Sequence, residues 1–106
     1  MDVIAIFAVV ERGKADHLVE KAKKAGAKGA TILYGRGTTA ENDIKHFLSF
    51  HVESSKEVII ILAEKEHVEA IQKALIEAGR LDEPGTGILF SVPVLHLTGL
   101  KHRGLP

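Results

Sequence analysis

The sequence predicts an α+β fold ordered β-α-β-β-α-β, a split βαβ arrangement with a four-stranded antiparallel sheet and two helices on one face. Short runs of branched apolar residues, typical of strands, alternate with two segments whose apolar residues recur at helical spacing. Each half reads strand, helix, glycine, strand, which is a weak internal duplication. With 106 residues, 45% hydrophobic and 26% charged, the chain is expected to form one globular domain over residues 1–100, followed by a tail at 101–106.

The first half begins with the apolar run Val3–Val10, which predicts a strand buried on both faces. Residues Lys14–Ala25 carry an apolar stripe with lysines on the outer side, so they are expected to form a helix that ends at Gly26. The run Ala30–Tyr34 predicts the second strand. The sequence then turns to Gly-Arg-Gly and polar residues, which predict a loop at 35–46.

Alternating residues predict the third strand. Leu48, Phe50 and Val52 alternate with polar residues, the period of a half-exposed strand. The branched run 58–63 is expected to be a central strand. Residues 47–63 could form one long strand with a bend at 53–56.

The second half ends with a helix and a strand. Residues Glu64–Ala78 carry an apolar stripe and acidic residues in the first turns, which favour a helix that stops at Gly79. A loop at 80–87 then leads into the strand Ile88–Val94. Both helices lie on one sheet face in this arrangement, and the strands are too apolar for the other face to meet water. We therefore expect an oligomer that buries the sheet faces.

Composition excludes several classes of function. Fourteen basic and fourteen acidic residues cancel, and a neutral domain without a basic run is a poor nucleic-acid binder. The absence of cysteine excludes disulfides and thiolate chemistry. The apolar N-terminal run is too short to span a bilayer and follows Asp2 rather than positive charge, so we expect a cytoplasmic protein without membrane insertion.

Two glycine segments are candidates for phosphate binding. In Gly35-Arg36-Gly37 and Gly85-Thr86-Gly87 the glycines would let backbone N–H groups approach an anion, and Arg36 adds a planar donor suited to phosphate. The two segments could meet across a subunit boundary. The simpler interpretation, that both are turns, stays open because glycine marks turns in many β-rich chains.

Metal binding and catalysis have weaker signals. His51 and Glu53 lie two apart on one strand face and could share a metal with a third ligand from another subunit, although no ligand cluster has a recognised spacing. The chain has no Walker-type phosphate loop and no nucleophile with an adjacent base, so we expect no enzyme activity.

The stretches "GAKGATILYGRGT" and "GTGILFSVPVLHLTGL" resemble the PII family of nitrogen-regulatory signalling proteins, most closely its short-loop, divergent members, over roughly residues 2–100. The resemblance implies a ferredoxin-like fold, a homotrimer and an adenine nucleotide (AMP, ADP or ATP) between subunits, with no required cofactor. It also implies a loop that contacts a protein partner such as a transporter or an enzyme.

The resemblance also implies site residues. The nucleotide-binding positions would be Thr31, Gly35, Arg36, Gly37, Thr38, Gly85, Thr86 and Gly87. The partner-binding loop would include Thr39, Ala40, Glu41, Asn42 and Asp43. Ile88 stands where the family usually has a lysine, and "VLHL" stands before Thr98-Gly99 in place of an R-x-R pair. These missing cations favour an AMP- or ADP-like ligand, or no ligand, over a triphosphate.

Two other classes share the expected architecture. A metal-binding trimer of the divalent-cation-tolerance type would depend on His51 and Glu53. A structural assembly subunit would bind no ligand. A small-molecule hydrolase has the least support, because the residues for it are missing.

Overall fold

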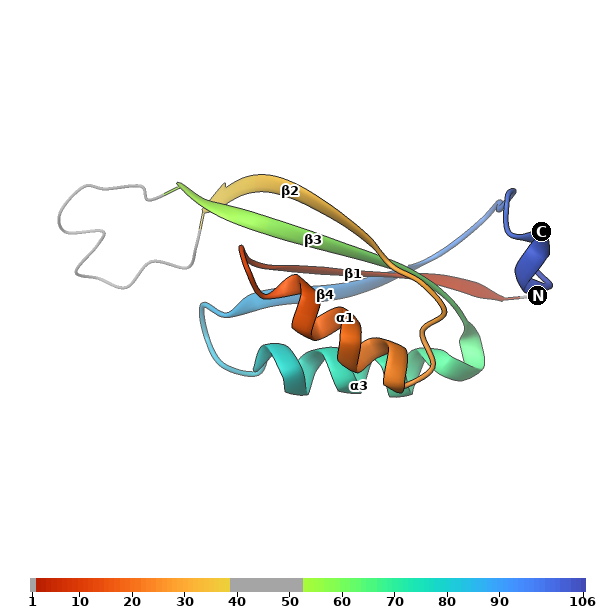
Figure 1. Cartoon of the computed structure of the whole chain (residues 1–106), viewed down its shortest axis with the longest axis horizontal. Helices are drawn as coiled ribbons and strands as arrows, with labels where there is room; N and C mark the ends of the chain where they lie inside the picture. Colours follow the sequence, from red (N-terminus) through yellow and green to blue (C-terminus); the bar gives the residue numbers. More distant parts are fainter. Residues whose placement is uncertain (1, 39–52) are drawn as a thin grey trace, which may run out of the picture.

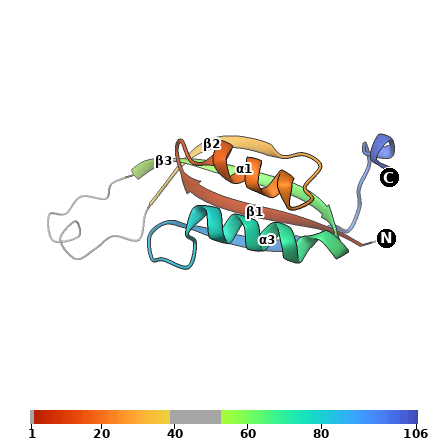
Figure 2. The ribbon, with the colours of Figure 1, turned by 60° about the horizontal axis from the view of Figure 1, so that its bottom comes forward.

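A computed structural model describes residues 2–38 and 53–106 (Figure 1). Over these residues a four-stranded antiparallel sheet has the strand order β2-β3-β1-β4. Both helices lie side by side on one face of the sheet (Figures 1 and 2). The predicted ferredoxin-like order is confirmed. The elements are β1 (Val3–Glu11), α1 (Ala15–Lys24), β2 (Thr31–Thr38), β3 (Glu53–Glu64), α3 (Lys65–Gly79), β4 (Gly87–Pro93) and the short 3-10 helix η1 (Lys101–Arg103).

The core lies between the sheet and the helices. Along β1 the side chains alternate, and Ile6, Ala8 and Val10 have no exposed surface. They pack against the apolar stripes that the sequence predicted, with Leu18 on α1 and Ile71 on α3 in the same buried cluster. The apolar side chains that recur every 2 residues in the strands and every 3.6 residues in the helices therefore form one buried layer.

Among residues 2–38 and 53–106, no helix covers the other face of the sheet. On β4, Ile88 is 59% exposed and Phe90 45%, and on β2 Leu33 is 49% exposed. Phe90 stacks on Phe7 of β1 with ring centroids 5.0 Å apart. Because Phe7 is only half-buried, β1 is not buried on both faces in the single chain.

The helix ends show two different uses of glycine. Gly26 ends α1 as predicted: its φ is +118°, its N–H donates to Lys23 O, and the Ala27 N–H donates to Ala22 O. Helix α3 ends at Gly79, one residue later than predicted, and Arg80 rather than Gly79 takes the left-handed conformation after it. Gly79 is needed for packing, because a Cβ there would lie 3.0 Å from Leu81 Cδ2.

The β2–β3 pair is longer than the sequence predicted. Residues 35–38 were expected to begin a loop, yet they continue β2 and pair with residues 53–56 of β3. Residues 53–56, where a bend was expected, belong to β3, which runs from Glu53 to Glu64. Pairing with a long partner satisfies the backbone of both segments, which outweighs the weak strand preference of glycine. The other observed boundaries differ from the predictions by one residue. The predicted strand at 48–52 lies outside the described residues.

The C-terminal tail folds back onto its own chain. Arg103 Nη2 donates to the Leu62 carbonyl over 3.1 Å, and Leu105 is 6% exposed. The Gly99 N–H donates to the carbonyl of Pro106. Residues 101–106 therefore lie at the end of the sheet opposite Thr38, where β2 ends (Figure 1).

Candidate functional site

The Gly-Arg-Gly segment lies at the end of edge strand β2. Gly35 pairs with Lys56 and Gly37 with Ser54, and neither glycine has a positive φ. A Cβ added at Gly35 would meet nothing within 4 Å. Nothing within the described chain therefore requires a glycine at position 35, and a glycine inside a strand often marks a close approach by a ligand or another chain.

Lys56 is a cation next to these glycines that sequence reasoning missed. A Cβ at Gly37 would lie 3.4 Å from Lys56 Cγ. The Lys56 side chain is only 12% exposed, and its Nζ lies 2.5 Å from Glu11 Oε1 on β1. The register of β2, β3 and β1 places Lys56 beside Gly35 and Glu11. No motif or residue spacing in the sequence indicates this position.

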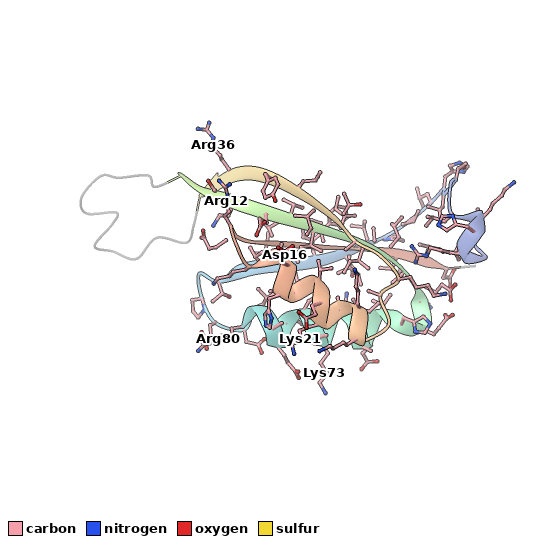
Figure 3. The ribbon with its side chains drawn as sticks, in the orientation of Figure 1. Arg12, Asp16, Lys21, Arg36, Lys73 and Arg80 are labelled. Carbon is pink, nitrogen blue, oxygen red and sulfur yellow. The ribbon has the colours of Figure 1, made fainter. Side chains whose placement is uncertain are left out.

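Side chains alternate along a strand, so Arg36 projects from the opposite side of β2 to Gly35. Figure 3 shows the Arg36 side chain pointing away from the sheet near the C-terminal end of β2. Thr31 is exposed at the other end of β2, opposite Ile60. Thr38 ends the strand opposite Glu53.

The second glycine segment has internal structural roles. Gly85 has φ +79°, which only glycine adopts readily. The Thr86 hydroxyl lies 2.8 Å from the Arg80 carbonyl and 2.9 Å from the Glu83 carbonyl, so it closes the loop before β4. At Gly87 a Cβ would lie 2.5 Å from the Val9 carbonyl, a clash with backbone. Gly87 is therefore required for β4 to pair with β1.

The two glycine segments lie at the same end of the sheet but on opposite edges. Gly35 is level with Lys56 and Glu11, and Gly87 pairs with Val10, the neighbour of Glu11. Three strand spacings separate β2 from β4, which is about 14 Å. One chain does not bring the segments together.

Part of the predicted site cannot be placed. Residues Thr39–Asp43 and His51 lie outside the described residues, as does the side chain of Glu53. The predicted partner loop and the His51–Glu53 metal pair therefore stay predictions.

A different carboxylate–histidine group appears at the start of α3. Ligand atoms of Glu64, Glu66 and His67 lie within 4.8 Å of one another. A hydrogen bond from its own backbone N–H, and then one from the Glu64 side chain, hold the pKa of the Glu66 carboxyl below its usual value. The sequence predicted only helix-start charge here. The spacing x, x+2, x+3 across a helix start is the signal that could have identified the group.

Among the described residues, no helix has the length and apolar character to cross a bilayer.

Comparison with known proteins agrees with this architecture. The family model for nitrogen regulatory protein P-II matches residues 3–102. Among solved structures, the chain is similar to Arabidopsis thaliana PII bound to citrate, with 24% sequence identity and a TM-score of 0.68 over 88% of this chain and 78% of that chain. No curated protein sequence matches it. The structural likeness shows the fold, and the family match spans almost every residue, so the chain belongs to the P-II family of nitrogen regulatory proteins.

Proposed function

We propose that this P-II protein is a non-enzymatic, cytoplasmic signalling homotrimer. It binds an adenine nucleotide between subunits and regulates a partner protein through the residues that follow β2. The observation that carries the proposal is the placement of the two glycine segments, level with each other on opposite edges of one sheet. A ring of three chains would set the β2 edge of one subunit beside the β4 edge of the next.

The uncovered sheet face supports the assembly. Large apolar side chains on β2 and β4 stay exposed in one chain, and contiguous apolar surface of this kind marks an interface. Copies of the chain packed through this face would remove it from water and bring the edges together.

The nucleotide would lie against the glycine side of β2. Gly35 leaves open space there, and Lys56 lies beside it. Arg36 projects from the other side, where its long side chain would reach a phosphate at the strand edge. Bound nucleotide would change the loop after β2 only as far as it binds one loop state better than another.

The β4 side favours a ligand with few phosphates. Ile88, 59% exposed, follows Gly87 directly and offers no charge. The Thr86 hydroxyl already lies against two carbonyl oxygens. AMP or ADP therefore fits this edge better than ATP, whose additional negative charge would lack a cation there.

The substitution Gly35→Ala tests the site without disturbing the fold. No atom within 4 Å opposes the added methyl group, and alanine in a strand is favoured over glycine by roughly 0.5–1 kcal/mol. We expect unchanged or higher thermal stability, together with loss of the thermal shift that AMP or ADP gives the wild type. A ligand at one hundred times its dissociation constant stabilises by about 2.7 kcal/mol, which a thermal melt detects.

Gly29→Ala is the matched control, because a Cβ there also meets nothing within 4 Å and the position precedes β2. It should keep the nucleotide shift. A shift that survives Gly35→Ala would contradict the proposed position, and the absence of any nucleotide shift in the wild type would contradict nucleotide binding. A metal shift alone would favour the His51–Glu53 alternative. In the same assay, unchanged affinity in Arg36→Ala would remove Arg36 from the phosphate site.

A further inference from the structure

An exposed arginine–tyrosine pair lies near the C-terminal end of β2, on the helix side of the strand. The Arg12 guanidinium carbon is 5.8 Å from the centre of the Tyr34 ring, a cation–π distance. Tyr34 is 73% exposed, and Arg12 is exposed as well. An aromatic ring this exposed contributes little to the core, so the core does not explain the pair.

The turn that carries Arg12 is held rigidly. Glu57 of β3 is 6% exposed, and its Oε1 accepts hydrogen bonds from the Gly13 N–H at 2.6 Å and the Ala15 N–H at 3.0 Å. The Arg12 N–H itself donates to the Ser55 carbonyl at 3.2 Å. Because the backbone on both sides is fixed, the turn holds Arg12 beside the Tyr34 ring and has little backbone freedom left to lose on binding.

The nearby charge favours an anion. Arg36 lies two residues beyond Tyr34 and therefore on the same side of the strand, and Figure 3 shows Arg12 and Arg36 at the same end of the sheet. Glu57, the carboxylate opposite Tyr34 in the register, is already engaged, because it accepts hydrogen bonds from the Gly13 and Ala15 N–H groups. A guanidinium above a ring keeps its in-plane N–H donors for a carboxylate.

We propose that the Arg12–Tyr34 surface is a docking site for an acidic segment of the partner protein. This rests on the proposed function, in which the protein acts on a partner beside the same loop. Tyrosine and arginine are the residues that most often dominate binding energy at interfaces. A protein carboxylate is favoured over nucleic acid, because the chain has no net charge and no basic run to neutralise a phosphate backbone.

The test measures binding of a short fluorescein-labelled peptide of aspartate and glutamate, by anisotropy, to the full chain. Arg12→Glu should weaken binding about tenfold or more, as expected for a charged anchor. Tyr34→Ala should weaken peptide binding. Tyr34→Phe should bind the peptide like the wild type, because the ring rather than the hydroxyl supports Arg12. Arg12→Gln, which keeps the side-chain length, gives a second variant should charge reversal disturb folding.

Lys73→Glu is the matched control, an exposed reversal on α3 on the far side of the helix layer (Figure 3). It should bind the acidic peptide like the wild type. Equal weakening by Lys73→Glu would show general charge attraction and overturn the proposal. A labelled single-stranded oligonucleotide that binds as tightly as the peptide, and loses binding in Arg12→Glu, would overturn it in favour of phosphate recognition. The nucleotide thermal shift should persist in Arg12→Glu, so failure here is separate from failure of the nucleotide site.

Discussion

At the residue scale, the buried carboxylate of Glu57 connects three parts of the chain. It projects from β3 into the helix side of the sheet and accepts hydrogen bonds from the turn before α1 and from the first residue of that helix. The residue at the helix cap position, Lys14, makes no side-chain cap hydrogen bond. A side chain distant in sequence thus performs the capping that serine or aspartate usually provides locally.

Glu57→Ala should destabilise the protein by about 1–3 kcal/mol, since two backbone N–H groups lose their acceptor. Urea unfolding followed by circular dichroism would measure the change. Glu57→Gln keeps one acceptor oxygen and should cost less. Glu77→Ala, an exposed position on α3, serves as the control and should change little. A loss for Glu57→Ala no larger than that of the control would show that the cap is dispensable.

At the element scale, the tail forms a separate small unit against the sheet. The Leu105 side chain is buried, and the Leu105 N–H donates to the Leu100 carbonyl at 3.1 Å. The Arg103 side chain adds its hydrogen bond to the Leu62 carbonyl on β3. A buried apolar side chain and a hydrogen bond to β3 therefore help to hold the tail against the fold.

Leu105→Ala should loosen the tail, because truncating a buried leucine typically costs 2–5 kcal/mol, about as much as a short segment of this kind can gain from docking. The amide hydrogens of Arg103 and Leu105 should then exchange faster with solvent, while those in the middle of β1 keep their protection. Hydrogen exchange measured by NMR would resolve the two groups. Lys101→Ala, at an exposed tail position, should leave both unchanged. Uniformly faster exchange would instead mean that tail and sheet unfold together.

At the scale of the whole molecule, we expect the uncovered sheet face to determine assembly. Phe7, Phe90 and Ile88 lie on the side away from the helices, and Phe90 stacks on Phe7 at the centre of that face. A trimer that closes through this face would bury them from each chain.

Phe90→Asp should prevent assembly, because a buried charge without a partner costs several kcal/mol. Light scattering coupled to size exclusion would show the mass falling from that of a trimer to that of a single chain. Lys73→Asp, on the opposite helix layer, should remain trimeric. A wild type that runs as a single chain, or a Phe90→Asp variant that stays trimeric, would contradict assembly through this face.

The sequence predicted the elements well because each carries its own period, and the boundaries of α1, α3, β1 and β4 agree to within one residue. It failed at Gly35–Gly37, where local glycine content indicated a loop but pairing with distant β3 extends β2. For the same reason, the roles of Lys56 and Glu57 could not be predicted from local sequence. Their neighbours, Glu11 and Gly13, are more than forty positions away in sequence, and only the register joins them. The packing role of Gly79 was not predicted for a related reason, since it depends on the nearby side chains of Leu81 and Leu18.

The position of β1 at the centre of the sheet affects how the protein is made. Both neighbours of β1 come later in the chain, and Ile4 pairs with Ala63 on one side and Pro93 on the other. At about 5–20 residues per second, the ribosome needs roughly 4–18 seconds to add the residues between Ile4 and Pro93. During that interval the apolar run emerges without a complete set of partners and can associate with other nascent chains. Asp2 before the run and Glu11 after it occupy the positions of charged gatekeepers, which in general oppose such association.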